Sequence, residues 1–222
     1  MPPNVSRFMR QSWTVGSAHA LVFVMDLFAT PATLVPLPID DGALALLAQL
    51  PLSLRNAEVF TRLLNETPWR EESIVVYGKR HLQPRLTAWY GDASYTYSGL
   101  RLEPLPWTAL LLEIRAAVEA VCGQRFNSVL LNRYRNGRDS MGMHSDDEAE
   151  LGEAPVIASL SYGATRTFIL RHKRDKRTVR LPLEDGSLLL MSGQLQKNWQ
   201  HGINKTTRPI GERLNLTFRY VF

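Results

Sequence analysis

Short segments in which polar and apolar residues alternate follow one another from residue 128 to residue 222. This alternation is typical of strands with one buried face. Gly163-Ala164 and Asp185-Gly186 supply turn residues between neighbouring segments. Many short strands joined by turns are typical of a jelly roll. We therefore predict strands over residues 128–134, 156–162, 167–172, 178–183, 187–191 and 213–222.

Helical spacing of apolar residues is found before these strands. A helix is predicted over residues 106–122, ending at Gly123, with apolar positions at Leu111, Ile114, Val118 and Val121. Two shorter packing helices are predicted, one from Asp40-Asp41 to Leu50 and one opening at Ser53. The predicted fold class is thus α+β, mainly β: a double-stranded β-helix (jelly roll) with supporting N-terminal helices.

Composition limits the class of protein. The chain has 222 residues, 45% of them hydrophobic, and no apolar run approaches the roughly 20 residues of a membrane span. This predicts one large globular domain without a membrane partner. A formal charge of +5 and a pI near 9.6 permit a polyanionic partner. The single Cys122 excludes a disulfide within the chain, fits a reducing compartment and is expected to be a buried structural thiol.

Residues 1–24 lack the periodicity of the rest. Arg7 and Arg10 precede an apolar stretch that Asp26 interrupts, which is a poor match to a secretory signal. We expect residues 1–24 to be a non-native or disordered extension, with Met25 as a candidate true start, and residues 25–222 to form a single domain. The expected location is cytoplasmic, or nuclear in a eukaryote, and not secreted.

His144 and Asp146 are two residues apart, so in an extended segment their side chains point to one face while Ser145 faces away. His201, from a distant strand, can complete a set of two imidazoles and one carboxylate. This is the facial triad of non-haem Fe(II) oxygenases, which leaves three positions open for co-substrate and oxygen. Alone, the motif also fits a solvated turn and a core histidine, so the metal site needs support from elsewhere in the chain.

The C-terminal strand carries a polar face made of Arg213, Asn215, Thr217 and Arg219. The plain interpretation is a half-buried strand whose polar side is in water. The alternative is a pocket for a small dicarboxylate, because the planar guanidinium of arginine binds carboxylates through two parallel bonds. The backbones of the two arginines are roughly 20 Å apart. Long side chains leaning inward could therefore hold both ends of one short diacid.

Five separated motifs then occur in a specific order along roughly residues 74–220. They are residues 132–137 (Asn-Arg-Tyr-Arg-Asn-Gly), residues 144–148 (His-Ser-Asp-Asp-Glu), the stretch 159–173, His201, and residues 213–219 (Arg-Leu-Asn-Leu-Thr-Phe-Arg). Together they resemble the AlkB family of Fe(II)- and 2-oxoglutarate-dependent dioxygenases, which remove alkyl lesions from nucleic acid bases. Residues 161–166, 171–173 and 90–92 look most similar to the branch that repairs duplex DNA.

The resemblance implies three cofactors: Fe(II), 2-oxoglutarate as co-substrate, and O2. It implies that His144, Asp146 and His201 are the metal ligands and catalytic residues. It also implies that the co-substrate is bound by Asn132, Tyr134, Arg213, Asn215, Thr217 and Arg219. The implied reaction is oxidative demethylation of N1-methyladenine or N3-methylcytosine in DNA, with release of formaldehyde, as repair of alkylation damage.

The resemblance further implies a nucleotide-recognition lid over about residues 74–105 and a jelly-roll core over about 106–222. Tyr77 would act as a finger that fills the gap left by a flipped base, Tyr97 would stack on that base and Tyr95 would approach its backbone. Asp147 would accept a bond from the exocyclic amino group and favour a cationic base. Further contacts are implied for Arg85, Glu148, Arg171, Lys173 and Arg174.

The dense basic run 171–177 is either a solvated loop or a contact to the phosphate backbone, and we favour the contact. Trp89 and Tyr90 are expected in the core. The implied partner is alkylated DNA, single- or double-stranded, with RNA as an alternative, and we expect a monomer.

Two interpretations from other classes stay open. The first is a hydrolytic zinc site with the same three ligands and a bound water as nucleophile. Arg213 and Arg219 speak against it, because hydrolysis needs no clamp for a diacid. The second is a catalytically silent nucleic-acid-binding jelly roll, against which the intact triad speaks. A dioxygenase that acts on RNA or tRNA is the nearest rival within the same class.

Overall fold

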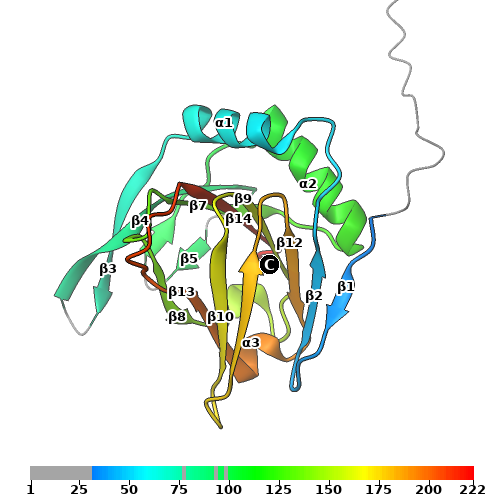
Figure 1. Cartoon of the computed structure of the whole chain (residues 1–222), viewed down its shortest axis with the longest axis vertical. Helices are drawn as coiled ribbons and strands as arrows, with labels where there is room; N and C mark the ends of the chain where they lie inside the picture. Colours follow the sequence, from blue (N-terminus) through cyan, green and yellow to red (C-terminus); the bar gives the residue numbers. More distant parts are fainter. Residues whose placement is uncertain (1–31, 77–78, 93–94, 98–99) are drawn as a thin grey trace, which may run out of the picture. The chain divides into compact units, whose positions relative to one another are not determined.

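Two antiparallel β-sheets form the centre of the fold (Figure 1). The computed structural model describes residues 32–76, 79–92, 95–97 and 100–222. The larger sheet has the strand order β1-β2-β12-β9-β14-β7-β4-β3 and the smaller one β11-β10-β13-β8. The strands are β1 (Val35–Leu37), β2 (Ala43–Leu47), β3 (Arg70–Val76), β4 (Lys79–Gly91), β7 (Ser128–Tyr134), β8 (Met141–His144), β9 (Ile157–Gly163), β10 (Arg166–His172), β11 (Thr178–Leu183), β12 (Leu188–Ser192), β13 (Trp199–Ile203) and β14 (Arg213–Arg219).

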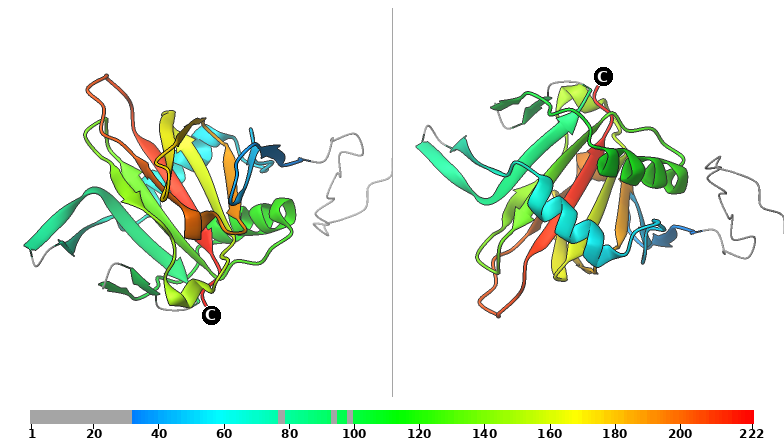
Figure 2. Two further views of the ribbon diagram at one scale, coloured as in Figure 1. Left: turned by 90° about the horizontal axis from the view of Figure 1, so that it is seen from below. Right: turned by 90° about the horizontal axis from the view of Figure 1, so that it is seen from above.

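The helices cover one face of the larger sheet. Figures 1 and 2 show α1 (Asn56–Glu66) and α2 (Ala109–Cys122) lying across this face. Val59 of α1 and Ile114 of α2 are fully buried and pack in one apolar cluster with Leu131 and Leu216 of the sheet. A second apolar cluster, which includes Trp89, Leu130, Phe168, Leu170 and Trp199, fills the space between the two sheets. Both faces of the central strands β7, β9 and β14 of the larger sheet are therefore buried.

The predicted jelly-roll strands are all present, with bounds that differ by one residue at most, except that β14 ends at Arg219, three residues before the predicted end. The predicted long helix is α2, which starts after Thr108, whose side chain accepts a hydrogen bond from the backbone N–H of Leu111. It ends at Gly123, which has the left-handed φ of 63°. Cys122 at its end is half-buried against the core, and burial raises the pKa of its thiol to about 11. The expected core positions of Trp89 and Tyr90 are confirmed.

The helix predicted from Asp40-Asp41 to Leu50 is wrong. Residues Ala43–Leu47 form β2, which pairs with β1 and with β12. A short apolar run has no helical or strand period of its own, so its neighbours in the fold decide its structure. Ser53 does not cap the next helix either: α1 begins at Asn56, and the Ser53 hydroxyl donates to Glu113 of α2.

Strand β14 lies in the middle of the larger sheet, between β7 and β9, and all seven of its residues are buried. The interpretation of its polar face as water-exposed is therefore wrong, because the second sheet covers that face. Strands β1–β4 belong to the same sheet, so segments before residue 106 also build the jelly roll. A separate two-stranded sheet consists of β5 (Tyr95–Tyr97) and β6 (Leu100–Leu102). In the described part of the chain, no helix is long and apolar enough to cross a membrane.

Candidate metal and co-substrate site

Three potential metal ligands meet at one end of the smaller sheet. His144 ends β8, Asp146 follows it, and His201 on β13 is the cross-strand partner of His144. The Nε2 atoms of His144 and His201 are 4.0 Å and 3.7 Å from carboxylate oxygens of Asp146. Candidate ligand atoms from the three residues all lie within 4.8 Å of one another. Two imidazoles and one carboxylate in this arrangement can occupy one face of an octahedral metal ion.

Hydrogen bonds orient these ligands. Nδ1 of His144 is 2.9 Å from the carbonyl oxygen of Gly142, which directs Nε2 toward the other two ligands. The Ser145 hydroxyl donates to the carbonyl of Trp199 over 2.9 Å. The backbone N–H of Asp146 donates to Oε1 of Gln196 over 3.0 Å. The segment that carries two of the three ligands is therefore fixed to the chain around β13.

The protonation states of the three residues suit metal binding. Burial lowers the pKa of His144, and it lowers the pKa of His201 to about 3. Burial alone would raise the pKa of Asp146, but the charge and hydrogen bond of Arg219 together with the two neighbouring imidazoles outweigh it, and the pKa falls to about 2. Nη2 of Arg219 donates to Oδ1 of Asp146 over 2.7 Å. At neutral pH the site therefore offers two neutral imidazoles and a carboxylate, the forms that bind metal.

One cavity connects the triad to a buried arginine. Arg213 lines this cavity together with the three ligands and is 2% exposed. Its Nη2 donates to the Ser161 hydroxyl over 2.9 Å, and its guanidinium lies 5.2 Å from the ring centre of Tyr134. Nε and Nη1 have no hydrogen-bond acceptor among the described residues, and no carboxylate there pairs with this guanidinium.

A buried guanidinium without a carboxylate is unfavourable unless a ligand supplies one. The planar donors of arginine match a carboxylate group. Beside a set of metal ligands, Arg213 therefore fits a co-substrate that binds the metal at one end and carries a carboxylate at the other.

Residues 47–219 match the family model described as the 2OG-Fe(II) oxygenase superfamily. The chain belongs to this superfamily. Alpha-ketoglutarate-dependent dioxygenase alkB homolog 3 of Bos taurus is 43% identical over 182 residues, which are 77% of this chain and 64% of the relative. DNA oxidative demethylase ALKBH2 of Homo sapiens is 44% identical over 177 residues, which are 74% of this chain and 68% of the relative. The predicted AlkB family is confirmed.

The chain spans a little over three fifths of the length of the alkB homolog 3 relatives, 64% for the bovine protein and 61% for the human one. A solved structure titled "The structure of OsALKBH1" superimposes with a TM-score of 0.58 at 17% identity, covering 83% of this chain and 99% of that one. This likeness supports the jelly-roll fold. Membership of the superfamily also confirms the predicted cofactors: Fe(II), 2-oxoglutarate and O2. The triad and Arg213 fit the metal and the co-substrate.

The residues predicted to bind 2-oxoglutarate all line the same cavity of this AlkB-type chain. Asn215 donates to the Ser159 hydroxyl over 2.8 Å, and the Thr217 hydroxyl donates to Oδ1 of Asn215 over 3.0 Å. The guanidinium groups of Arg213 and Arg166 lie 5.2 Å and 5.6 Å from the ring centre of Tyr134. Arg219 differs from the others, because it bonds the metal ligand Asp146. Whether these residues contact the co-substrate stays a prediction.

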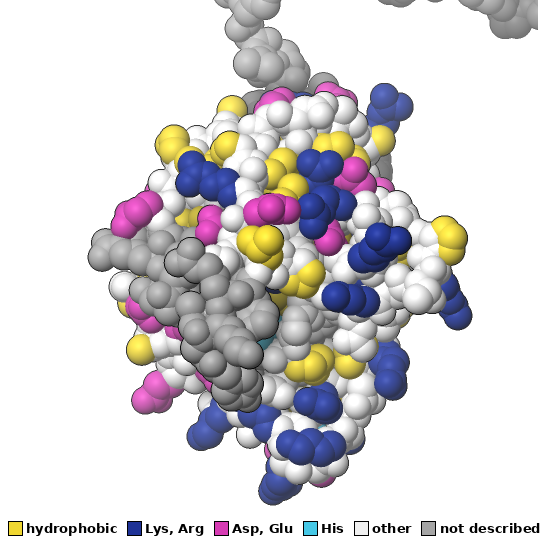
Figure 3. Space-filling view, turned by 90° about the vertical axis from the view of Figure 1, so that its left-hand side faces the viewer, with side chains coloured by type: hydrophobic (Ala, Val, Ile, Leu, Met, Phe, Trp, Pro, Cys, Tyr) yellow, Lys and Arg dark blue, Asp and Glu magenta, His cyan; other side chains and the backbone are white. Residues whose placement is uncertain are grey.

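The residues predicted to contact nucleic acid are less closely grouped. The side chain of Asp147 is 60% exposed and forms an ion pair with Lys173. Arg171 and Arg174 are exposed and Glu148 is half-buried. Arg85 is buried and donates to Oδ1 of Asn132 over 2.7 Å. Figure 3 shows a histidine side chain near the middle of one face, with Lys and Arg side chains spread over the surface around it.

The nucleotide-recognition lid was predicted over about residues 74–105, and several of these residues lie outside the described part of the chain. Tyr95 and Tyr97 belong to β5, where they pair with Leu102 and Leu100 of β6. Tyr77 lies outside the described residues. The roles of all three tyrosines stay predictions.

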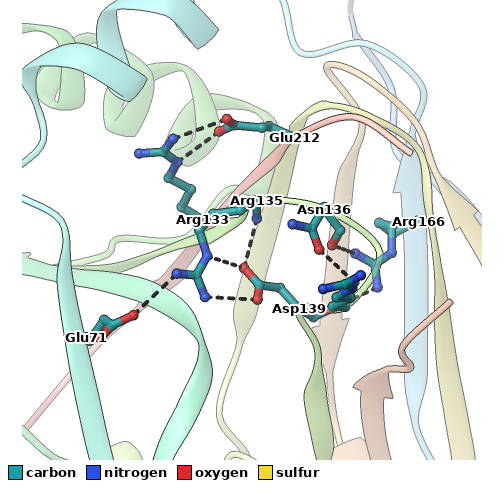
Figure 4. A network of polar contacts seen from close by, with 8 residues as sticks. Glu71, Arg133, Arg135, Asn136, Asp139, Arg166 and Glu212 are labelled. Atoms are coloured by element: carbon teal, nitrogen blue, oxygen red, sulfur yellow. Dashed lines mark hydrogen bonds and ion pairs between the residues drawn. The ribbon is translucent and has the colours of Figure 1, made fainter. Parts of the chain in front are cut away.

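Sequence reasoning missed an arginine that holds loops near the co-substrate cavity. Arg166 is 3% exposed and donates to the backbone carbonyls of Asn136, Asp139 and Asn204, the last over 2.7 Å. Figure 4 shows its bond to Asn136 beside the ion pair of Arg135 with Asp139. The only sequence feature that could have indicated this role is the position of Arg166 as the first residue of a largely apolar strand. These contacts fix the turn that follows β7, the strand that carries Asn132 and Tyr134.

Gln196 was missed as well, because it lies in the four-residue helix α3 (Leu195–Asn198), which shows no periodic pattern. It is 2% exposed, and its side chain accepts the backbone N–H of the metal ligand Asp146. A polar group that orients a ligand in this way typically changes metal affinity by about 10- to 100-fold when it is removed.

We expect Gln196→Met, which keeps the volume but loses the acceptor, to weaken Mn(II) binding by about 10- to 100-fold. Gln196→Glu keeps an acceptor oxygen and should retain more of the affinity. The measurement is a calorimetric Mn(II) titration, with thermal unfolding of the metal-free variants as the control for folding. Wild-type affinity in a folded Gln196→Met variant would contradict the orienting role.

Proposed function

We propose that this protein is an Fe(II)- and 2-oxoglutarate-dependent dioxygenase that removes N-methyl groups from bases in DNA. The proposal rests mainly on one observation: the His144-Asp146-His201 triad and the guanidinium of Arg213 line the same cavity. Two nitrogen atoms of this guanidinium have no hydrogen-bond acceptor among the described residues. A hydrolytic zinc site has no use for a buried carboxylate receptor. The relative named DNA oxidative demethylase ALKBH2, at 44% identity, supports DNA as the substrate.

Different residues would bind the metal, bind the co-substrate and position a metal ligand. His144, Asp146 and His201 would hold Fe(II), and Arg213 would bind the far carboxylate of 2-oxoglutarate, with Asn132 and Tyr134 assisting. Arg219 keeps Asp146 ionised and in place through its bond to Oδ1. Bound Fe(II), with 2-oxoglutarate and O2, supplies the oxidation that converts the N-methyl group into formaldehyde and leaves succinate and carbon dioxide.

The substrate would approach from the side of Asp147. Its carboxylate follows the ligand Asp146 directly in sequence, but it is exposed whereas that of Asp146 is buried. An exposed carboxylate beside the metal site can accept a hydrogen bond from an exocyclic amino group of a flipped base. It also attracts a cationic base such as N3-methylcytosine more than a neutral one.

The test is formaldehyde and succinate release by Fe(II)-loaded protein given 2-oxoglutarate and O2, with methylated oligonucleotides as single-stranded DNA, duplex DNA and RNA. Some succinate is expected without DNA, and this background is subtracted. We expect methylated DNA to yield one formaldehyde for each additional succinate. Asp147→Asn should change base preference with little loss of succinate formation in the absence of DNA. Succinate without formaldehyde from any of the three would refute demethylation, and formaldehyde from RNA alone would refute DNA as the substrate.

A further inference from the structure

Asp146 and Asp147 are consecutive carboxylates with opposite surroundings. The side chain of Asp146 is 1% exposed and bonds Arg219, whereas that of Asp147 is 60% exposed. The two side chains lie in the irregular segment that follows β8, and only one of them reaches the surface. Asp147 therefore faces outward, into a surface pocket that Lys173, Gln196 and Lys197 also line, and it is the residue next to the metal ligand Asp146 in the chain.

The ammonium group of Lys173 lies next to this outward carboxylate. Nζ is 3.3 Å from Oδ2 of Asp147 and donates to the backbone carbonyl of Gln196 over 2.9 Å. Gln196 in turn accepts the N–H of Asp146 through its side chain. The lysine side chain is 34% exposed, so it is partly held by its surroundings. Its charge is thus fixed beside Asp147 by a bond that does not depend on Asp147.

A cation at this position changes what the carboxylate can select. Asp147 alone would attract a positively charged base, but the Asp147–Lys173 pair has no net charge. Lys173 both occupies one carboxylate oxygen and repels a second cation. Charge discrimination at this end of the site is therefore weaker than an isolated aspartate would produce.

We propose that Lys173 is a specificity-determining residue that lowers the preference of this site for cationic alkylated bases over neutral ones. The inference rests on the proposed function and adds to it a residue that sets the relative affinity for neutral and cationic N-alkylated bases. It also gives Lys173 a role other than the phosphate contact predicted from the basic run. A phosphate contact would strengthen the binding of every oligonucleotide alike.

The test compares two single-stranded oligonucleotides that differ in one ring. One carries N3-methylcytosine, which is cationic at neutral pH, and the other carries N3-methyluracil, which is neutral and of nearly the same shape. Dissociation constants are measured by fluorescence anisotropy without turnover, using Mn(II)-loaded protein with 2-oxoglutarate under anaerobic conditions. The readout is the ratio of the dissociation constant of the neutral oligonucleotide to that of the cationic one.

Lys173→Met should raise this ratio by about three- to tenfold, as expected for removing one partly screened charge near the base. Lys173→Arg keeps the charge and should stay near the wild-type ratio. Lys197→Met is the matched control: Lys197 is exposed on the same surface pocket, and it forms no ion pair in the described part of the chain. The control should leave the ratio unchanged.

Three results would overturn the proposal. The first is an unchanged ratio with weaker binding of both oligonucleotides, which would identify a phosphate contact. The second is an equal shift in Lys173→Met and Lys197→Met, which would show a general effect of net charge. The third is a lowered unfolding temperature of Lys173→Met with an unchanged ratio, which would show a purely structural role. Failure of the proposed function looks different, because the wild type would then bind neither methylated oligonucleotide more tightly than an unmodified one.

Discussion

Replacing Asp146 by alanine is expected to remove metal binding and to destabilise the metal-free protein by about 3–5 kcal/mol. The metal would lose its only charged ligand of the triad. The buried guanidinium of Arg219 would lose the carboxylate that it bonds over 2.7 Å. Removing one member of a buried ion pair is costly because the remaining charge stays in a medium of low polarity. One substitution should therefore produce two separate losses.

The two losses are separable by experiment. Metal binding is measured by titration with Mn(II), and stability by urea unfolding in the presence of a chelator, so that metal binding does not contribute to it. His144→Ala is the matched control. It removes a ligand that is 21% exposed and does not touch Arg219, so it should weaken metal binding but reduce stability by no more than about 1–2 kcal/mol. Equal destabilisation by both variants would contradict the structural role of the Arg219–Asp146 pair.

Replacing Arg213 by methionine is expected to have the opposite effect on stability. The variant should lose about 2–5 kcal/mol of 2-oxoglutarate binding free energy, which is about 30-fold to several thousandfold in Kd. Its unfolding free energy should stay the same or rise slightly, because an apolar side chain replaces a buried charge that no carboxylate of the described residues neutralises. Affinity for Mn(II) alone should be unchanged, since Arg213 is not a ligand.

Calorimetric titration of the Mn(II)-loaded protein with 2-oxoglutarate measures this effect. Ser161→Ala serves as its control, because it removes only the hydroxyl that accepts one bond from Arg213. We expect the alanine variant to keep most of the co-substrate affinity, with a loss of about 1 kcal/mol. If Arg213→Met binds 2-oxoglutarate as tightly as the wild type, the carboxylate of the co-substrate binds elsewhere.

Local patterns in the sequence were sufficient to predict most of the strands and the longest helix. The two-residue alternation predicted the strands of the jelly roll, since it reports on a backbone whose side chains alternate between two faces. Helical spacing and Gly123 predicted α2 in the same way. The motif with His144 and Asp146 placed two metal ligands on one face. Each of these features depends on residues that are close together in sequence, so it can be predicted without knowledge of the tertiary structure.

Only the tertiary structure decided where β14 and residues 43–47 lie. The alternation in β14 is compatible with one face in water, and the second sheet excludes this by covering its polar side. Residues 43–47 form a strand because β12 offers them a partner.

The same holds for the contacts of Gln196, Lys173 and Arg219, whose partners are between 23 and 73 residues away in sequence. Sequence periodicity describes which face a residue occupies on its own element. It contains no information on which distant charge or acceptor meets that residue, because packing of separate elements determines those distances.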